Sequence, residues 1–117
     1  MTNYSDMTNE QLDKAVAEKV MGWHIENILN PFHYELLWCT DKVILSKKDY
    51  HPSIDILHAL EVMNQMIADG WVVNMTGDSL CWWVCFIKDD DMQGESDDKL
   101  LSRAICISAL RAKESEE

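Results

Sequence analysis

The sequence predicts an α/β fold of the α+β class: a single α-β-α sandwich whose mainly antiparallel sheet is covered by helices on both faces. Apolar residues recur at helical spacing in three separate segments. Between them lie short apolar runs joined by turn residues, which gives the order α-β-β-α-β-β-α. One of these runs is apolar on both faces, and such a strand needs packing on both sides of its sheet. With 117 residues, the chain has room for one hydrophobic core.

The first helix is predicted over residues 9–21. Thr8 and Gln11 have the spacing of a capping box, in which the side chain of each residue bonds the backbone N–H of the other. Apolar residues then follow at helical spacing until Gly22, a residue type that commonly ends helices. The residues before this signal are mostly polar. We therefore expect a flexible N-terminus over 1–7 and a folded domain over 8–112.

The segment after the first helix gives weaker signals. Residues 24–33 show no regular period and contain the breaker Asn30-Pro31, which predicts an irregular connection. Residues 34–39 and 42–46 are typical of two short strands, which predicts a hairpin, although the first of them also permits a helix.

A second helix is predicted over residues 54–69. Ser53 is a suitable N-cap, and Asp55 in the first turn complements the positive end of the helix dipole. Gly70 is expected to close the helix. Its predicted buried face consists of five apolar residues at helical spacing, namely Ile56, Ala59, Leu60, Met63 and Ile67.

A second hairpin is predicted from strands at 71–75 and 80–87, which flank the turn residues 76–79. Side chains alternate between the two faces of a strand, so Trp82 and Trp83 must point to opposite faces. One face carries Trp82, Val84 and Phe86, and the other carries Cys81, Trp83, Cys85 and Ile87.

The C-terminal part combines an acidic segment with an apolar helix. Residues 89–98 are rich in Asp, Gly and Ser, which predicts a loop. Ser96 is placed to cap a helix that runs through 100–112, with two aspartates in its first turn. This helix is apolar nearly all round, which indicates a central position or a subunit interface, so we expect a homo-oligomer, namely a dimer. Residues 113–117 are expected to form a charged tail.

Charge limits the classes of partner. The chain carries 21 acidic and 10 basic side chains, a formal net charge of -11. Direct binding to nucleic acid depends on Lys and Arg that replace counterions, so we expect none. The same charge disfavours anionic membranes and favours encounter with a basic surface. Residues 1–6 lack the pattern of a secretory signal, and the longest apolar run is far too short to span a membrane.

The residues give no indication of catalysis, a cofactor or a metal ion. The four cysteines have no Cys-x-x-Cys spacing, and the four histidines fall in no metal-binding motif. Buried thiols and locally hydrogen-bonded histidines explain them. There is no Gly-x-Ser-x-Gly elbow and no Gly-rich phosphate loop. We therefore expect a protein that is not an enzyme and that works by binding.

Four landmarks in a fixed order resemble the phage ABA sandwich domain, found in bacteriophage proteins of unassigned role. The resemblance implies α, β and α layers over most of 8–112 and places the protein in the cytoplasm of the host bacterium. The segment 24–50 shows no fixed pattern of this family. The landmarks are Ala17-Glu18-Lys19-Val20-Met21-Gly22-Trp23, then Pro52-Ser53-Ile54-Asp55-Ile56 leading into Ala59-Leu60-Glu61-Val62-Met63, then Gly70-Trp71, then Ala104-Ile105-Cys106-Ile107-Ser108-Ala109-Leu110.

Two functions from different classes follow as hypotheses. The first is an antagonist of host antiviral defence that binds a basic host protein through an acidic surface; its candidate residues are Asp89, Asp90, Asp91 and Glu95. The second is a sponge that sequesters a small cyclic nucleotide used as an immune signal. Helix N-terminal amides around Ser53 and Asp55 would hold its phosphate, and the rings of Trp71 and Trp82 would stack its base. A structural or regulatory phage dimer is a third reading.

Overall fold

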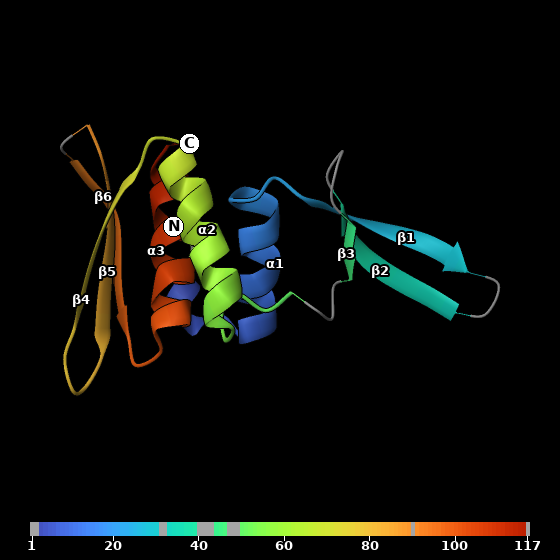
Figure 1. The fold of residues 1–117 in the computed structure, drawn as a ribbon, viewed down its shortest axis with the longest axis horizontal. Helices are drawn as coiled ribbons and strands as arrows, with labels where there is room; N and C mark the ends of the chain where they lie inside the picture. The colour runs from blue at the N-terminus through green and yellow to red at the C-terminus, as the bar shows by residue number, and fades with distance from the viewer. Residues whose placement is uncertain (1–2, 31–32, 40–43, 47–49, 90, 117) are drawn as a thin grey trace.

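The structure, a computed structural model, describes residues 3–30, 33–39, 44–46, 50–89 and 91–116 (Figure 1). Three helices form a central layer, a three-stranded sheet covers one side of it, and a second three-stranded sheet extends from the other side (Figure 1). The elements in chain order are a 3-10 helix at Tyr4–Asp6, α1 (Asn9–Lys19), β1 (His24–Asn30), β2 (His33–Cys39), β3 (Ile44–Ser46), α2 (Ile56–Ala68), β4 (Val72–Gly77), β5 (Trp82–Lys88), β6 (Asp91–Asp98) and α3 (Leu101–Ser115).

The predicted α+β class and the alternation of helices with antiparallel hairpins are confirmed. The strands, however, divide between two sheets, ordered β1-β2-β3 and β4-β5-β6. All three helices lie on one side of the β4-β5-β6 sheet, and the outer face of this sheet carries no helix among the described residues (Figure 1).

Two segments that were predicted to be irregular are strands. Residues His24–Asn30 form β1, which pairs with β2 along its whole length. Asn30, which was read as part of a breaker, is the last residue of this strand. Asp91–Asp98, predicted as a loop, forms β6 and pairs with β5. Pairing with a neighbouring strand therefore outweighs the low intrinsic strand preference of acidic residues and glycine. The predicted hairpin of β2 and β3 is confirmed, although residues 40–43 lie outside the described part of the chain.

Helix α3 is the centre of the molecule. Its residues 104–110 are all buried, and it packs against α1, α2, β5 and β6. A Cβ atom added to Gly94 in β6 would lie 2.4 Å from the backbone oxygen of Ser108, so only glycine permits this approach of strand to helix. The predicted central position is confirmed. One chain alone covers the apolar surface of α3, so this helix no longer supports the expected dimer.

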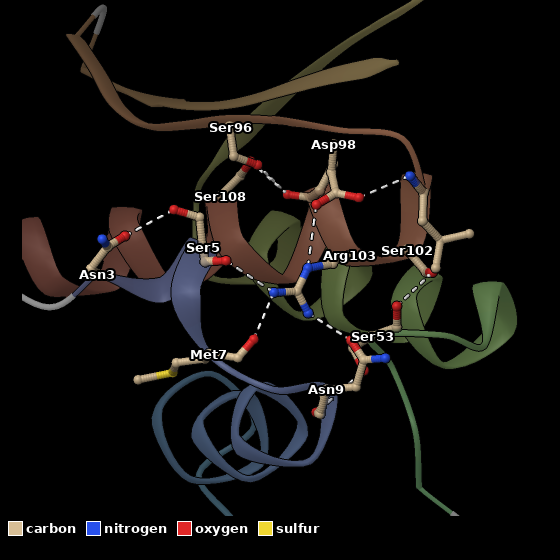
Figure 2. Close-up of polar contacts among 12 residues, drawn as sticks. Asn3, Ser5, Met7, Asn9, Ser53, Ser96, Asp98, Ser102, Arg103 and Ser108 are labelled. Carbon is tan, nitrogen blue, oxygen red and sulfur yellow. Dashed lines mark hydrogen bonds and ion pairs between the residues drawn. The ribbon is translucent and has the colours of Figure 1, made fainter. Parts of the chain in front are cut away.

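The start of α3 differs from the prediction. The helix begins at Leu101, and Leu100 N–H donates to a carboxylate oxygen of Asp98 at 3.0 Å. Ser96 caps no helix: its hydroxyl donates to the carbonyl of Ala104 at 2.9 Å and lies 3.0 Å from the Ser108 hydroxyl (Figure 2). The two aspartates expected in the first helical turn belong to β6. At the other end, α3 extends into the predicted tail, through Ser115.

Local capping signals placed α1 correctly. The capping box of Thr8 and Gln11 is present, with both reciprocal hydrogen bonds formed, and Gly22 adopts the left-handed conformation that follows many helices. A 3-10 helix at Tyr4–Asp6 precedes α1. Tyr4 is fully buried, and its segment packs against α3.

The second helix begins two residues later than predicted. Asp55 is its N-cap, and its carboxylate accepts the N–H of Leu57 at 2.9 Å, so Ser53 does not cap α2. The buried line of α2 is Ala59, Val62 and Met66. Ile56 and Ile67 were predicted to be core residues but are exposed. The reason is that α2 turns the side with Ala59, Val62 and Met66 toward the core.

Candidate functional site

The predicted phosphate-binding residues are committed to internal contacts. Ser53 is completely buried, and its backbone N–H donates to a carboxylate oxygen of Asp13 at 2.8 Å. Its carbonyl accepts the hydroxyl of Ser102 at 2.9 Å, which joins the segment before α2 to α3 (Figure 2). The Asp55 carboxylate caps its own helix. The backbone N–H of Ser53, which was expected to bind a phosphate, is therefore already bonded to the carboxylate of Asp13.

The two candidate tryptophans for a small-ligand site lie in different surroundings. Trp71 is 2% exposed and belongs to the core, with Lys88 Nζ 5.0 Å from its ring centroid. It follows α2, whereas Ser53 precedes α2, and a helix of 13 residues is about 20 Å long. Trp82 is 39% exposed, and its ring lies over Gly77, where a Cβ would approach it to 2.7 Å. Ser53, Trp71 and Trp82 therefore do not enclose one pocket.

The predicted acidic residues that the structure describes lie on or beside β6 of the β4-β5-β6 sheet. Asp89 lies in the turn after β5 with a φ of 55, and Asp90 lies outside the described residues. Asp91 and Glu95 are exposed on β6. Because β6 is paired with β5 along its length, these carboxylates are held on a sheet and not on the loop that was predicted.

This surface is completed by Asp97, which belongs to the acidic segment seen in the sequence, and by Trp83, which was not among the predicted site residues. Trp83 pairs with Asp97 across the β5-β6 ladder, on the sheet face that points away from α3. The indole N–H of Trp83 donates to a carboxylate oxygen of Glu95 at 3.3 Å. Strand alternation places Trp82 and Trp83 on opposite faces, but it does not reveal which face meets the helices. The sequence therefore left open which of the two tryptophans faces outward.

We call Asp89, Asp91, Glu95 and Asp97 the acidic strand surface. These four residues make no ion pair with any described residue. By contrast, the neighbouring Asp98 pairs with Arg103 at 3.3 Å. Glu95 and Asp97 lie exposed beside Trp83, whereas Asp91, beyond the register shift in β5, stands opposite Lys88 in the ladder. The backbone of β6 is held by α3, since Arg111 Nη1 donates to the carbonyl of Glu95 at 2.7 Å.

Cys81, just before β5, has a thiol whose pKa is affected by nearby carboxylates. The pKa of Cys81 is raised, first by partial desolvation and then by the carboxylates of Asp78, Asp97 and Asp98. These three carboxylates place negative charge around the start of β5 and the end of β6. The same end carries exposed apolar side chains, Leu80, Trp82 and Leu100.

The described part of the chain contains no group of three His, Cys, Asp or Glu side chains that could hold a metal ion. Cys81, Cys85 and Cys106 are free thiols. None of the described helices combines the length and the apolar character needed to cross a membrane.

Comparison with known families now connects this fold to a biological source. The profile of the phage ABA sandwich domain matches residues 14–110, which is most of the chain. The chain belongs to the phage ABA sandwich domain family. This match confirms the resemblance that the four landmarks indicated. The residues of the acidic strand surface lie within the matched part of the chain.

A solved structure shares the fold. The crystal structure of a phage protein from Bacillus cereus ATCC 14579 superimposes with a TM-score of 0.67 and 19% sequence identity, covering 96% of this chain and 98% of that one. A likeness at this identity establishes the fold. A search of the curated proteins gives no match.

Proposed function

We propose that this phage protein acts by stoichiometric binding of a basic host protein, and that the acidic strand surface is its contact. One observation carries the proposal: Asp89, Asp91, Glu95 and Asp97 are exposed on or beside a paired strand and make no ion pair with a described residue. Carboxylates fixed in this way lose little conformational freedom when Lys or Arg side chains pair with them.

The outer face of the sheet supports a more specific contact. Trp83 lies between Glu95, which accepts its indole N–H, and Asp97, its partner across the ladder. An aromatic ring flanked by two carboxylates suits a guanidinium group, because the ring face attracts a cation and carboxylates accept its paired N–H donors. An arginine of the partner is therefore the expected central contact.

Membership of a phage family favours, by analogy, a host antiviral defence protein as the basic partner. Host proteins that bind nucleic acid present Lys and Arg at the binding surface, and an acidic strand can compete for those side chains. Net charge of -11 also speeds encounter with such a surface at low salt.

Affinity capture from lysates of defence-positive host cells tests the proposal. The test variant combines Asp91→Asn, Glu95→Gln and Asp97→Asn. The matched control combines Glu10→Gln, Glu18→Gln and Glu61→Gln, which removes the same charge from exposed positions on α1 and α2. We expect the wild type and the control to retain a partner that the test variant loses, with a cost of about twofold to fivefold in affinity for each substitution. Equal loss with both variants would mean that net charge alone drives capture.

Sequestration of a cyclic nucleotide is the alternative outcome of the same work. Nucleotide absorbance that copurifies with the protein, or a rise in melting temperature on addition of cyclic dinucleotides, would replace the protein partner by a small ligand. Because Ser53 and Trp71 are buried, such a ligand would have to bind elsewhere on the molecule.

A further inference from the structure

The two edges of the β4-β5-β6 sheet differ in charge. The edge strand β6 carries several acidic residues, so two copies of it repel each other. The other edge strand, β4, has the sequence Val-Val-Asn-Met-Thr-Gly, without a charged residue or a proline. Its Val72 is 60% exposed and its Met75 is 42% exposed. An unpaired, uncharged and partly apolar edge is a template for another strand, and proteins usually protect such edges with charges.

Helix α2 adds apolar surface beside this edge. Ile56, Leu60, Met63 and Ile67 recur at intervals of four, three and four residues, which places them on one flank of the helix. The opposite flank carries His58, whose ring stacks on Tyr50, and Tyr50 packs with Ala17 of α1. The apolar flank therefore faces away from α1, toward β4. Met63 and Val73 of β4 pack against the same core, while Ile56 and Ile67 stay exposed.

We propose that a second copy of this chain docks on this surface, with the β4 strands of the two copies paired antiparallel. The edge of β4 and the exposed part of the α2 flank together form the β4 surface. The charge distribution favours a second copy as the partner on the β4 surface. Two molecules of net charge -11 can approach closely only through uncharged surfaces, and β4 contains no ionisable residue. A basic partner, in contrast, is drawn to the carboxylates of β6.

A two-fold arrangement suits this strand. In an isologous dimer each copy contributes the same patch, and antiparallel pairing of identical strands satisfies that symmetry. The pairing joins two three-stranded sheets into one continuous sheet and covers both exposed β4 edges. The acidic strands then lie at the two far ends of the joined sheet, so dimerisation leaves the proposed partner contact open in both copies.

Multi-angle light scattering in the micromolar range tests the proposal on the full chain. We expect the wild type to have twice the 13.5 kDa mass of one chain. Val72→Glu, which adds a negative charge to the uncharged edge of two chains that are already acidic, should weaken the dimer by at least about tenfold. Thr76→Lys should weaken it in the same direction although it lowers the net negative charge. Ala68→Glu, at an exposed position of α2 away from the apolar flank, is the matched control and should leave the dimer intact.

Salt and hydrogen exchange separate this dimer from other assemblies. Added salt screens the repulsion between the two acidic copies, so we expect the dimer to hold or strengthen with salt, opposite to the partner complex of β6. Backbone amides of residues 72–77 should exchange more slowly as protein concentration rises. A monomer in the micromolar range, or a dimer that both Val72→Glu and Thr76→Lys leave unchanged, would overturn the proposal.

Discussion

Arg103 and Asp98 form an ion pair, with Nε 3.3 Å from the carboxylate oxygen, that joins the end of β6 to the first turn of α3 (Figure 2). The same guanidinium donates to the side chain of Asn9 at 2.6 Å and to the carbonyls of Met7 and Ser5 at 2.7 and 3.2 Å. One side chain therefore ties the N-terminal segment, the central helix and the acidic strand together.

Arg103→Ala should lower the free energy of unfolding by about 2 kcal/mol or more, because several charge-assisted hydrogen bonds are lost together. Arg103→Lys should recover part of this loss, since an ammonium group keeps the charge but cannot reach all the acceptors. Chemical denaturation measures both. Lys99→Ala, at an exposed neighbouring position, is the control. A variant Arg103→Ala as stable as this control would show that the network contributes nothing.

Substitutions of two glycines compare the stability cost of a steric clash with the cost of an unfavourable backbone conformation. Gly94→Ala places a Cβ against the backbone of α3, which cannot move aside, so we expect a loss of about 3 kcal/mol. Gly22→Ala meets open space, and only the left-handed backbone, with a φ of +72, opposes it, at a cost of about 1 kcal/mol. Denaturation midpoints of the two variants measure the difference. Equal stability of the two would contradict the packing of β6 on α3.

The turn between β4 and β5 should respond to acid. The pKa of Asp78 is lowered by hydrogen bonds from the backbone N–H groups of Cys81 and Leu80. A carboxyl whose pKa is lower in the folded state stabilises the protein above its unfolded pKa, and this contribution is lost as pH falls through the folded pKa. Asp78→Ala should therefore lower the melting temperature at neutral pH. The difference from wild type should shrink below pH 4, and a constant difference down to pH 2 would argue against this role.

Thiol reactivity should follow burial. The pKa of Cys106 is raised mainly by burial, and nearby Asp13 raises it further. Burial and then Glu95 raise the pKa of Cys85. A raised pKa leaves little thiolate at neutral pH, so both residues should resist alkylation in the folded protein and react fully after unfolding. Peptide mapping after iodoacetamide treatment measures this, and rapid labelling of Cys106 in the folded state would contradict its central position.

Local signals predicted the helices, whereas contacts distant in sequence determined much of the rest. The capping box of Thr8 and Gln11 depends on neighbours within one turn, so the start of α1 was predictable. Ser96 looked equally suited to capping, but its hydroxyl bonds Ala104 and Ser108 of α3. Nothing in the local sequence distinguishes these two uses of a serine.

The candidate site was predicted in composition but not in geometry. The acidic character of residues 89–98 was evident, yet their pairing with β5 depends on the partner strand and not on their own preference. The rings of Trp82 and Trp83 follow strict alternation, but only the packing of α3 decides which of them faces outward. Ser53 was selected for its position before a helix, while its burial results from contacts with Asp13 and Ser102.

Plaque formation on defence-positive hosts tests the central claim most directly. A phage whose protein carries Asp91→Asn, Glu95→Gln and Asp97→Asn should form fewer plaques on these hosts and normal numbers on hosts without the defence system. The control with Glu10→Gln, Glu18→Gln and Glu61→Gln should behave as wild type. If the acidic-strand variant protects the phage as fully as the wild type does, binding through the acidic strand surface is wrong.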